Sequence, residues 1–388
     1  MNSIQIGIIG CGKISDLHAL GYKDHEQARI TAVSDVDLGL AEQKRAQWGA
    51  DRSYRDYRKL LEDPNIDAVE ILTPQKLHEQ MTLEALDAGK HVMLQKPMAI
   101  SLESADRMIS AAESSDKVFK VIENYIFYPP IIRCRELIDS GAIGDPIQIR
   151  IKFLSGSSGG WDIPEETWAW RFEENAEGRG MQTFDHGHHM WSAAWYLMGN
   201  FERVSAWIDS YNGVIDCPAS IMWKYEDGSR YGVCDYTHAY DMHIPSKYYA
   251  NDEWIEVYGS KGMIQVNRCT GNVNEGPVLS IFNGNQWNYE HTIPSDWSEG
   301  FIGSTRNFIR AIKGLEQPFL GGRDARKILS YSLAIQLSAR ERREVYIEEL
   351  DSPLGEQYSK NRIAQELKKQ KHRRSITLEE LKNGPRIL

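Results

Sequence analysis

Lys96, Asp185 and His189 are the side chains best suited to move a proton to or from a bound alcohol. Asp185 and His189 are four residues apart, so on a helix they share one face. A histidine titrates near neutral pH and can accept a hydroxyl proton, while a neighbouring carboxylate orients the substrate or stabilises the imidazolium. Lys96 can hydrogen-bond the same hydroxyl. We therefore expect these three residues to be catalytic and to bind the substrate.

The place of Lys96 in the chain supports this reading. It follows an apolar run at 91–94 and precedes Pro97, which favours an extended backbone at the lysine and permits a cis bond. A cation at the end of a buried strand is costly unless it has a role. The alternative is a lysine that extends its charge to the surface.

Three histidines in four residues, His186, His188 and His189, also raise the possibility of a metal site. They do not share one helix face, and the sequence offers no second ligand cluster, so we expect no metal. His188 belongs to an apolar stripe with Phe184 and Trp191 and is expected to be buried in the core.

A glycine turn near the N-terminus predicts a dinucleotide site. An apolar run from Ile4 leads into Gly10 and Gly12, and a helical pattern follows. Gly10 would permit a tight turn and Gly12 a close approach of the backbone to a pyrophosphate, whose charge the helix N-terminus would hold. Ser15 occupies the third position, where glycine is usual. A tight turn without a ligand is the alternative. The cofactor-binding residues expected here are Gly10, Gly12, Lys13 and Ile14.

Asp35 lies at the end of the second apolar run, at the distance where an acidic residue accepts hydrogen bonds from the adenosine ribose. A carboxylate there repels the extra phosphate of NADP, so NAD is the expected cofactor. The alternative is an aspartate that only begins a turn.

Thr73, Pro74 and His78 follow the third apolar run. Ligands of an open parallel sheet lie beyond the carboxyl ends of the strands, so these residues are expected to contact the cofactor. Pro74 also suits the first turn of a helix, and His78 is equally well explained as a satisfied helix histidine.

The first third of the chain alternates strand and helix patterns, which predicts a parallel, doubly wound α/β sheet. The expected strands are 4–9, 28–35, 68–72, 91–94 and 118–122, and the expected helices are 16–23, 38–48, 54–61, 77–88 and 102–115.

From about Asn124 the pattern changes to longer strands and fewer helices, which predicts an α+β domain with a large, mostly antiparallel sheet. The many aromatic residues of this sheet suggest that its open face covers a partner subunit. We expect three parts: a dinucleotide-binding domain at 1–123, a substrate-binding and oligomerisation domain at 124–350, and a charged tail at 351–388. The expected strands of the second domain are 146–154, 201–211, 219–226, 231–239, 254–258, 263–267 and 278–282, with helices from 129 to about 140, at 301–313 and at 324–341.

The segment 155–180 reads as a long loop rich in tryptophan and arginine. Long loops commonly bind or cover a substrate, and indole faces stack on sugar rings. A structural loop or an oligomer contact explains the composition equally well. We take Trp161 and Arg171, together with Tyr128, as substrate-binding candidates.

Composition excludes several classes of protein. The chain has 388 residues and a formal net charge of −10, which disfavours nucleic acid or an anionic membrane as a partner. No apolar run is long enough to span a bilayer, and no signal-peptide pattern precedes Ile4. Five scattered cysteines without CxxC spacing favour a reducing cytoplasm.

Taken in order, these motifs resemble the Gfo/Idh/MocA family of NAD(P)-dependent oxidoreductases over about residues 4–345. The residues that carry the resemblance are the turn at 7–15, Thr73-Pro74 with His78, Lys96-Pro97, Asp185 with His189, and the strand-turn-strand pattern at 255–262.

The resemblance implies an N-terminal Rossmann domain and a C-terminal domain whose open-faced sheet forms homodimers or homotetramers. It implies that Lys96, Asp185 and His189 are catalytic, with the histidine as proton acceptor, and that Asn124 contacts the nicotinamide region. It also implies sugars, sugar derivatives or cyclitols as substrates. The family's usual glutamate before the lysine is replaced by Gln95, another expected cofactor contact, and a frequent aspartate after the histidine is replaced by Ser192.

The sequence therefore predicts an NAD-dependent dehydrogenase acting on a secondary alcohol of a sugar, glycoside or cyclitol. Two alternatives stay open. One is an NAD-bound enzyme that uses transient oxidation for non-redox glycoside cleavage. The other is a non-catalytic NAD-binding sensor with a protein partner.

Overall fold

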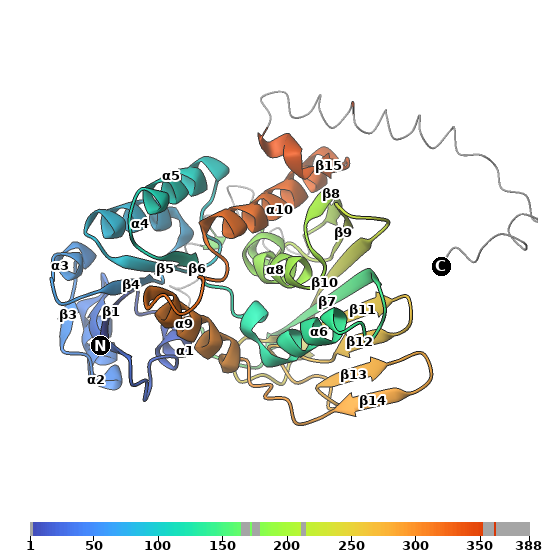
Figure 1. Cartoon of the computed structure of the whole chain (residues 1–388), viewed down its shortest axis with the longest axis horizontal. Helices are drawn as coiled ribbons and strands as arrows, with labels where there is room; N and C mark the ends of the chain where they lie inside the picture. The colour runs from blue at the N-terminus through green and yellow to red at the C-terminus, as the bar shows by residue number, and fades with distance from the viewer. Residues whose placement is uncertain (1–2, 164–170, 173–178, 211–214, 352–360, 362–388) are drawn as a thin grey trace, which may run out of the picture.

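The computed structural model describes residues 3–163, 171–172, 179–210, 215–351 and 361 (Figure 1). Nearly all of the expected charged tail at 351–388 lies outside the described residues, as do Trp168 and Trp170 of the expected tryptophan-rich loop. None of the helices in the described ranges is long and apolar enough to cross a lipid bilayer.

The N-terminal part contains a parallel sheet of six strands in the order β3-β2-β1-β4-β5-β6. The strands are β1 (Ile4–Ile9), β2 (Ala28–Ser34), β3 (Arg52–Tyr54), β4 (Ala68–Ile71), β5 (His91–Leu94) and β6 (Phe119–Val121). The strand order reverses between β1 and β4, and this point is where doubly wound sheets hold their ligands. The α/β prediction for this part is confirmed.

Helices connect these strands. They are α1 (Ser15–Ala19), α2 (Leu38–Trp48), α3 (Tyr57–Leu61), α4 (His78–Asp87) and α5 (Leu102–Glu113). The Asp56 carboxylate accepts from the Arg58 backbone N–H and starts α3, so the segment expected as one helix at 54–61 is divided between β3 and α3. The first helix, α1, is also shorter than expected.

The second sheet has nine strands in the order β14-β13-β12-β11-β7-β10-β9-β8-β15 and is antiparallel except between β7 and β10. Its strands are β7 (Pro146–Ser158), β8 (Phe201–Ile208), β9 (Ala219–Tyr225), β10 (Tyr231–His243), β11 (Asn251–Gly259), β12 (Met263–Val266), β13 (Leu279–Phe282), β14 (Trp287–Glu290) and β15 (Val345–Tyr346). The expected α+β class is confirmed, whereas β14 and β15 were not expected.

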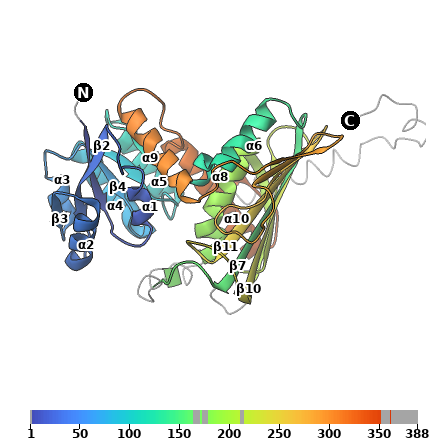
Figure 2. The same ribbon diagram turned by 90° about the horizontal axis from the view of Figure 1, so that it is seen from below.

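Helices cover one face of this second sheet. Figure 2 shows α6 (Pro129–Asp139), α8 (Gly187–Met198) and α10 (Gly322–Glu341) on the side toward the parallel sheet. The other face is bare over the described residues. Burial alternates along β9, where Ile221 and Trp223 are buried and Met222 is exposed, as expected for a sheet with one covered face.

Two helices join the halves. Helix α9 (Ser298–Ile312) packs against α1, and its Phe308 and Ile309 share a core with Ile6 and Ile8 of β1. Helix α10 contacts both α5 and β8. Apolar burial therefore continues from one sheet to the other, and the ends of β4 and β5 are held opposite α8.

Candidate active site

The glycine turn between β1 and α1 has the shape that a dinucleotide site requires. Gly10 has φ +97°, and a Cβ there would lie 2.6 Å from the Leu72 carbonyl oxygen. A Cβ on Gly12 would meet no atom within 4 Å, so the backbone there borders open space that a pyrophosphate could fill. The Ser15 hydroxyl donates to the Gly12 carbonyl at 2.6 Å, and this bond ties the turn to the helix without a third glycine.

Asp35 lies directly beside this turn. One carboxylate oxygen accepts from the Cys11 backbone N–H at 2.8 Å, and the other accepts from the Asp37 N–H at 2.9 Å. The carboxylate is only partly buried and each oxygen retains a free lone pair, so the geometry fits ribose hydroxyls as ligands.

The His78 ring contacts the backbone of the segment that follows β4. Its Nε2 lies 2.8 Å from the Thr73 carbonyl oxygen and its Nδ1 lies 3.1 Å from the Pro97 carbonyl oxygen. Burial lowers the pKa of His78 to about 4, although these carbonyls act in the opposite direction, so the ring is neutral at pH 7. His78 therefore connects the loop after β4 to the loop after β5. Thr73 and Pro74 remain half-buried at the edge of the sheet.

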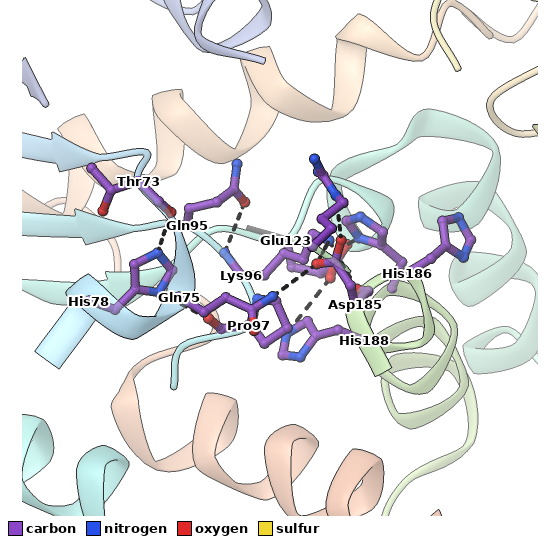
Figure 3. A network of polar contacts seen from close by, with 12 residues as sticks. Thr73, Gln75, His78, Gln95, Lys96, Pro97, Glu123, Asp185, His186 and His188 are labelled. Atoms are coloured by element: carbon purple, nitrogen blue, oxygen red, sulfur yellow. Dashed lines mark hydrogen bonds and ion pairs between the residues drawn. The ribbon is translucent and has the colours of Figure 1, made fainter. Parts of the chain in front are cut away.

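Lys96 and Asp185 meet across the space between the two halves (Figure 3). The Lys96 ammonium donates to the Asp185 carboxylate at 3.0 Å and to its backbone carbonyl at 2.9 Å. The Gln75 amide donates to the same carboxylate oxygen at 3.1 Å. The bond between Lys96 and Pro97 is cis, as the sequence allowed.

Asp185 belongs to a π-helical turn, Met181–His186, that leads directly into α8. Its backbone N–H donates to the Gly180 carbonyl, five residues back, at 3.2 Å. Asp216 stabilises the start of the turn by accepting from the Gln182 and Thr183 backbone N–H groups. The expected regular helix through Asp185 is thus a wider turn at this point.

The charges around Asp185 keep it ionised. Burial alone would raise the pKa of this carboxyl, but Lys96 and Arg171 outweigh burial and hold the pKa well below its usual range. The Arg171 Nε lies 3.5 Å from Asp185 Oδ2. The site therefore presents a carboxylate between two cations.

His189 is buried one helical turn further along, with 6% of its surface exposed. Burial and the Lys96 cation hold the pKa of His189 well below its usual range, so the ring is neutral and able to accept a proton. Its Nδ1 lies 2.7 Å from Glu123 Oε1, and its ring stacks on Tyr125 with centroids 4.6 Å apart. Sequence reasoning missed Glu123. The available signal was a carboxylate directly after the apolar run at 118–122.

The two other histidines of this segment, His186 and His188, have different surroundings. His188 is fully buried, as expected, and burial lowers its pKa to about 3. His186 Nε2 lies 3.1 Å from the buried Glu253 Oε1. No group of three or more His, Cys, Asp or Glu side chains within the described ranges is placed to hold a metal ion.

Gln95 has partners that suit an amide. Its oxygen accepts from the Lys96 backbone N–H at 2.8 Å, and its NH₂ donates to His18 Nε2 at 3.2 Å. His18 Nδ1 in turn lies 3.0 Å from Glu70 Oε2, and Tyr22 donates to the other oxygen of Glu70. The buried Glu70 already supplies the negative charge beside His18, so a neutral side chain at position 95 completes the network.

The expected substrate contacts do not all come together. Arg171 reaches Asp185, and the Trp161 ring lies 5.2 Å from the Lys13 ammonium of the glycine turn. Tyr128, in contrast, is fully buried and donates its hydroxyl to the Ser295 carbonyl at 2.9 Å. The structure therefore places Tyr128 in the core, with its hydroxyl already bonded.

The residues around the turn fit a nicotinamide dinucleotide. Gly12 borders open space, Asp35 faces the same region, and both amide atoms of Asn124 lack a hydrogen-bond partner within the described part of the chain. An unpartnered amide at the end of β6 suits the carboxamide of a nicotinamide.

A parallel sheet with this turn, joined to a second domain whose π-helical turn and helix α8 supply Asp185 and His189, defines a two-domain oxidoreductase of the dinucleotide-binding class. The chain belongs to the Gfo/Idh/MocA oxidoreductase family. Residues 4–123 match the family's NAD-binding Rossmann-fold model, and residues 131–265 match its C-terminal domain model. The predicted family, enzyme class, Rossmann fold and NAD cofactor are confirmed.

Known proteins resemble the chain over most of its length. It is 27% identical over 357 residues to myo-inositol 2-dehydrogenase of Thermotoga maritima, a match that covers 89% of this chain and 99% of that one. It is 29% identical over 219 residues to levoglucosan dehydrogenase of Pseudarthrobacter phenanthrenivorans, covering 54% of this chain and 55% of that one. A solved structure of levoglucosan dehydrogenase with NADH and L-sorbose has a TM-score of 0.76 at 22% identity, covering 89% of this chain and 99% of that chain.

Proposed function

We propose that this chain transfers hydride between NAD and a secondary alcohol of a sugar, glycoside or cyclitol. The observation that carries the proposal is the contact between Lys96 and Asp185, which sets a cation and a carboxylate one helical turn from His189. The names of the relatives support the substrate class, because one acts on inositol and another on levoglucosan.

Each catalytic residue has a separate role in this proposal. Lys96 donates a hydrogen bond to the reacting hydroxyl oxygen, and Asp185 fixes Lys96 and orients the substrate. His189 accepts the hydroxyl proton because its ring is neutral. When bound, NAD⁺ would supply the acceptor for the hydride that leaves the carbon bearing this hydroxyl. Burial of the group excludes water while hydride moves.

The cofactor is held in this proposal by the edge of the parallel sheet. Gly10 and Gly12 admit the pyrophosphate, Asp35 binds the ribose and disfavours NADP, and Asn124 binds the nicotinamide carboxamide. The further contacts proposed are Lys13, Ile14, Thr73, Pro74, Gln95 and Lys96. His78 is left out, because it is fully buried and both ring nitrogens face backbone carbonyls.

Trp161 and Arg171 remain the proposed substrate contacts outside the catalytic group. Trp161 can offer an indole face to a sugar ring, and Arg171 can hydrogen-bond a hydroxyl while it is held by Asp185. Tyr128 is not part of this proposal, because its hydroxyl is already bonded in the core.

A screen of NAD reduction tests the function. Cyclitols, aldoses, anhydrosugars and glycosides are offered with NAD, and with NADP in parallel. We expect NADH to form at 340 nm with at least one of these classes and NAD to be preferred. Tight NAD binding without turnover of any of them would contradict the proposal and favour a sensor, whereas substrate cleavage without net NADH would favour the non-redox enzyme.

We also propose that the bare face of the second sheet forms a homodimer or homotetramer. The exposed fraction is 82% for Trp207, 54% for Met222 and 43% for Tyr231, and the three project from neighbouring strands. Apolar residues on such a face suit a subunit interface. Light scattering of W207D/M222D should then give a smaller particle than the parent protein.

Two further expectations remain proposals. We propose the division at 123 and 350 into cofactor, substrate and tail segments, which is supported by the separation of the two sheets. We propose the cytoplasm as the compartment, which is supported by five cysteines that are free and buried.

A further inference from the structure

Glu123 contacts the imidazole of His189 through one carboxylate oxygen. Its Oε1 is 2.7 Å from His189 Nδ1, and the same oxygen accepts the Tyr125 backbone N–H at 3.0 Å. Glu123 has no exposed surface. The two residues come from different halves of the molecule, because Glu123 follows β6 and His189 lies in α8.

We propose that Glu123 is a positioning residue for His189: its carboxylate holds the proton on Nδ1 and thereby leaves Nε2 free to accept the proton of the substrate hydroxyl. This inference rests on the proposed function and deepens it. Lys96, Asp185 and His189 alone do not determine which ring nitrogen is the base, whereas the contact with Glu123 does.

The hydrogen bonds around Glu123 indicate the ionised form. Oε1 accepts a backbone N–H, which a carboxylate oxygen does better than a hydroxyl oxygen. Oε2 lies 4.0 Å from His188 Nε2, and the Ser192 hydroxyl, which lowers the pKa of Glu123, also favours the charged form. Burial raises the pKa of this carboxyl, and the nearby His188, the Tyr125 N–H and Lys96 oppose the rise.

Tyr125 fixes the orientation of the imidazole plane. The two rings are stacked with an angle of 29°, and the Tyr125 hydroxyl is anchored 2.8 Å from Thr270 Oγ1. The imidazole is therefore held at its edge by Glu123 and on its face by Tyr125. His189 Nε2 makes no hydrogen bond within the described part of the chain and is left for a ligand.

The step balances with the cofactor as the oxidant. The O–H bond of the alcohol breaks, its proton goes to His189 Nε2, and its electron pair forms the C=O bond. The C–H bond breaks, and hydride with its electron pair goes to NAD⁺. The imidazolium produced keeps its Nδ1–H bond to Glu123, whose negative charge offsets the new positive charge.

The first test reads the tautomer without any substrate. Long-range ¹H–¹⁵N spectra of the full-length protein labelled in its 11 histidines report which nitrogen carries the proton, and His189→Gln identifies the resonance. We expect the Nδ1–H form in the parent protein and a mixture in Glu123→Ala. An Nε2–H form in the parent protein, or an unchanged tautomer in Glu123→Ala, would overturn the proposal.

The second test uses Glu123→Gln, which keeps an acceptor of similar shape but removes the charge. We expect kcat for alcohol oxidation to fall about 100-fold, with KM for NAD and substrate changed less than about threefold. The acid limb of the kcat profile should move to lower pH, because the imidazolium loses its counter-charge. The other groups that affect this titration, namely Lys96, Asp185, His186 and Glu253, are unchanged in the variant.

Glu349→Gln is the matched control. Glu349 is also a buried carboxylate, 5% exposed, but it pairs with Arg343 away from the site. We expect normal kcat and an unshifted pH profile. An equal loss in both variants would overturn the positioning role and indicate a general effect of losing a buried charge. Failure of the proposed function looks different, because the parent protein would then turn over none of the alcohols, whichever tautomer His189 adopts.

Discussion

Lys96 and Asp185 are 89 residues apart in the sequence, and their side chains meet at 3.0 Å. Lys96 lies near the start of the loop after β5, and Asp185 lies in the turn that leads into α8. Each charge lies close to the other in a half-buried space. The attraction between them offsets the free-energy cost of removing each charge from water. The proposed reacting group is therefore built from both domains.

Substitution of this lysine tests the catalytic assignment. Lys96→Met should bind NAD with nearly unchanged affinity, since Lys96 is not among the groups that hold the pyrophosphate or ribose. Turnover should fall about 100- to 10,000-fold, because the hydroxyl loses its hydrogen-bond donor and Asp185 loses its main counter-charge. Calorimetric titration with NAD and the rate of NADH formation measure the two effects.

The control for this lysine is Lys59→Met, which removes an exposed cation paired with Glu62. It should leave both quantities unchanged. Turnover of Lys96→Met within threefold of the parent enzyme would refute the assigned role.

The two glycines of the turn should respond differently to the same change. Gly10→Ala places a Cβ at φ +97° and 2.6 Å from the Leu72 carbonyl oxygen, so it should lower the free energy of unfolding by about 2 kcal/mol or more. Gly12→Ala meets no protein atom within 4 Å and should leave stability nearly unchanged. It should still weaken NAD binding about tenfold or more, because the methyl group occupies space expected for the pyrophosphate.

Urea unfolding and NAD titration of both glycine variants check this contrast. A destabilised Gly12→Ala would show that the space beside this residue is filled by the protein itself. Unimpaired NAD binding by Gly12→Ala would show that the cofactor does not pass there.

Asp35 should determine the choice between NAD and NADP. Asp35→Ser removes one hydrogen-bond acceptor for the ribose and also removes the charge that repels a 2′-phosphate. The KM for NAD should therefore rise about tenfold, and the ratio of kcat/KM for NAD to that for NADP should fall. Asp37→Ser is the control two residues away. Asp37 caps α2 by accepting from Gly39 and Leu40, and serine is also a good cap. If the parent enzyme preferred NADP, Asp35 would not be the residue that binds the ribose hydroxyls.

The buried His78 should make stability depend on pH. Its folded pKa of about 4 lies below its ordinary value of 6.5, so between these values the unfolded chain binds more protons than the folded one. Stability is therefore lost as the pH falls, and His78 alone should remove about 2 kcal/mol between pH 7 and pH 5. Urea unfolding at both pH values should show a smaller loss for His78→Gln than for the parent protein. An equal loss in the two would contradict the assignment.

The sequence was sufficient for the broad architecture because its signals are local. The apolar run at 4–9 and the glycines after it are both contained within a few residues. The short strand β15 was missed because two residues carry no periodicity, and its place at the sheet edge depends on pairing with β8.

The supporting groups of the site were not predictable in the same way. The contact between Glu123 and His189 joins residues 66 apart, and the network from Gln95 through His18 to Glu70 spans three separate elements. No spacing rule connects such residues before the chain is folded. One hint was present: Glu70 is a charged residue inside the apolar run at 68–72, which is costly without a buried partner.

The two bonds from Lys96 to Asp185 and from Glu123 to His189 both cross from the parallel-sheet half to the segment around α8. A change in the angle between the halves would lengthen both bonds at once. The proton acceptor would then lose its fixed tautomer at the same moment as the hydroxyl-binding cation lost its partner. The proton acceptor and the hydroxyl-binding cation are therefore positioned by the same packing between the two halves, and a substitution that disturbs this packing would affect both.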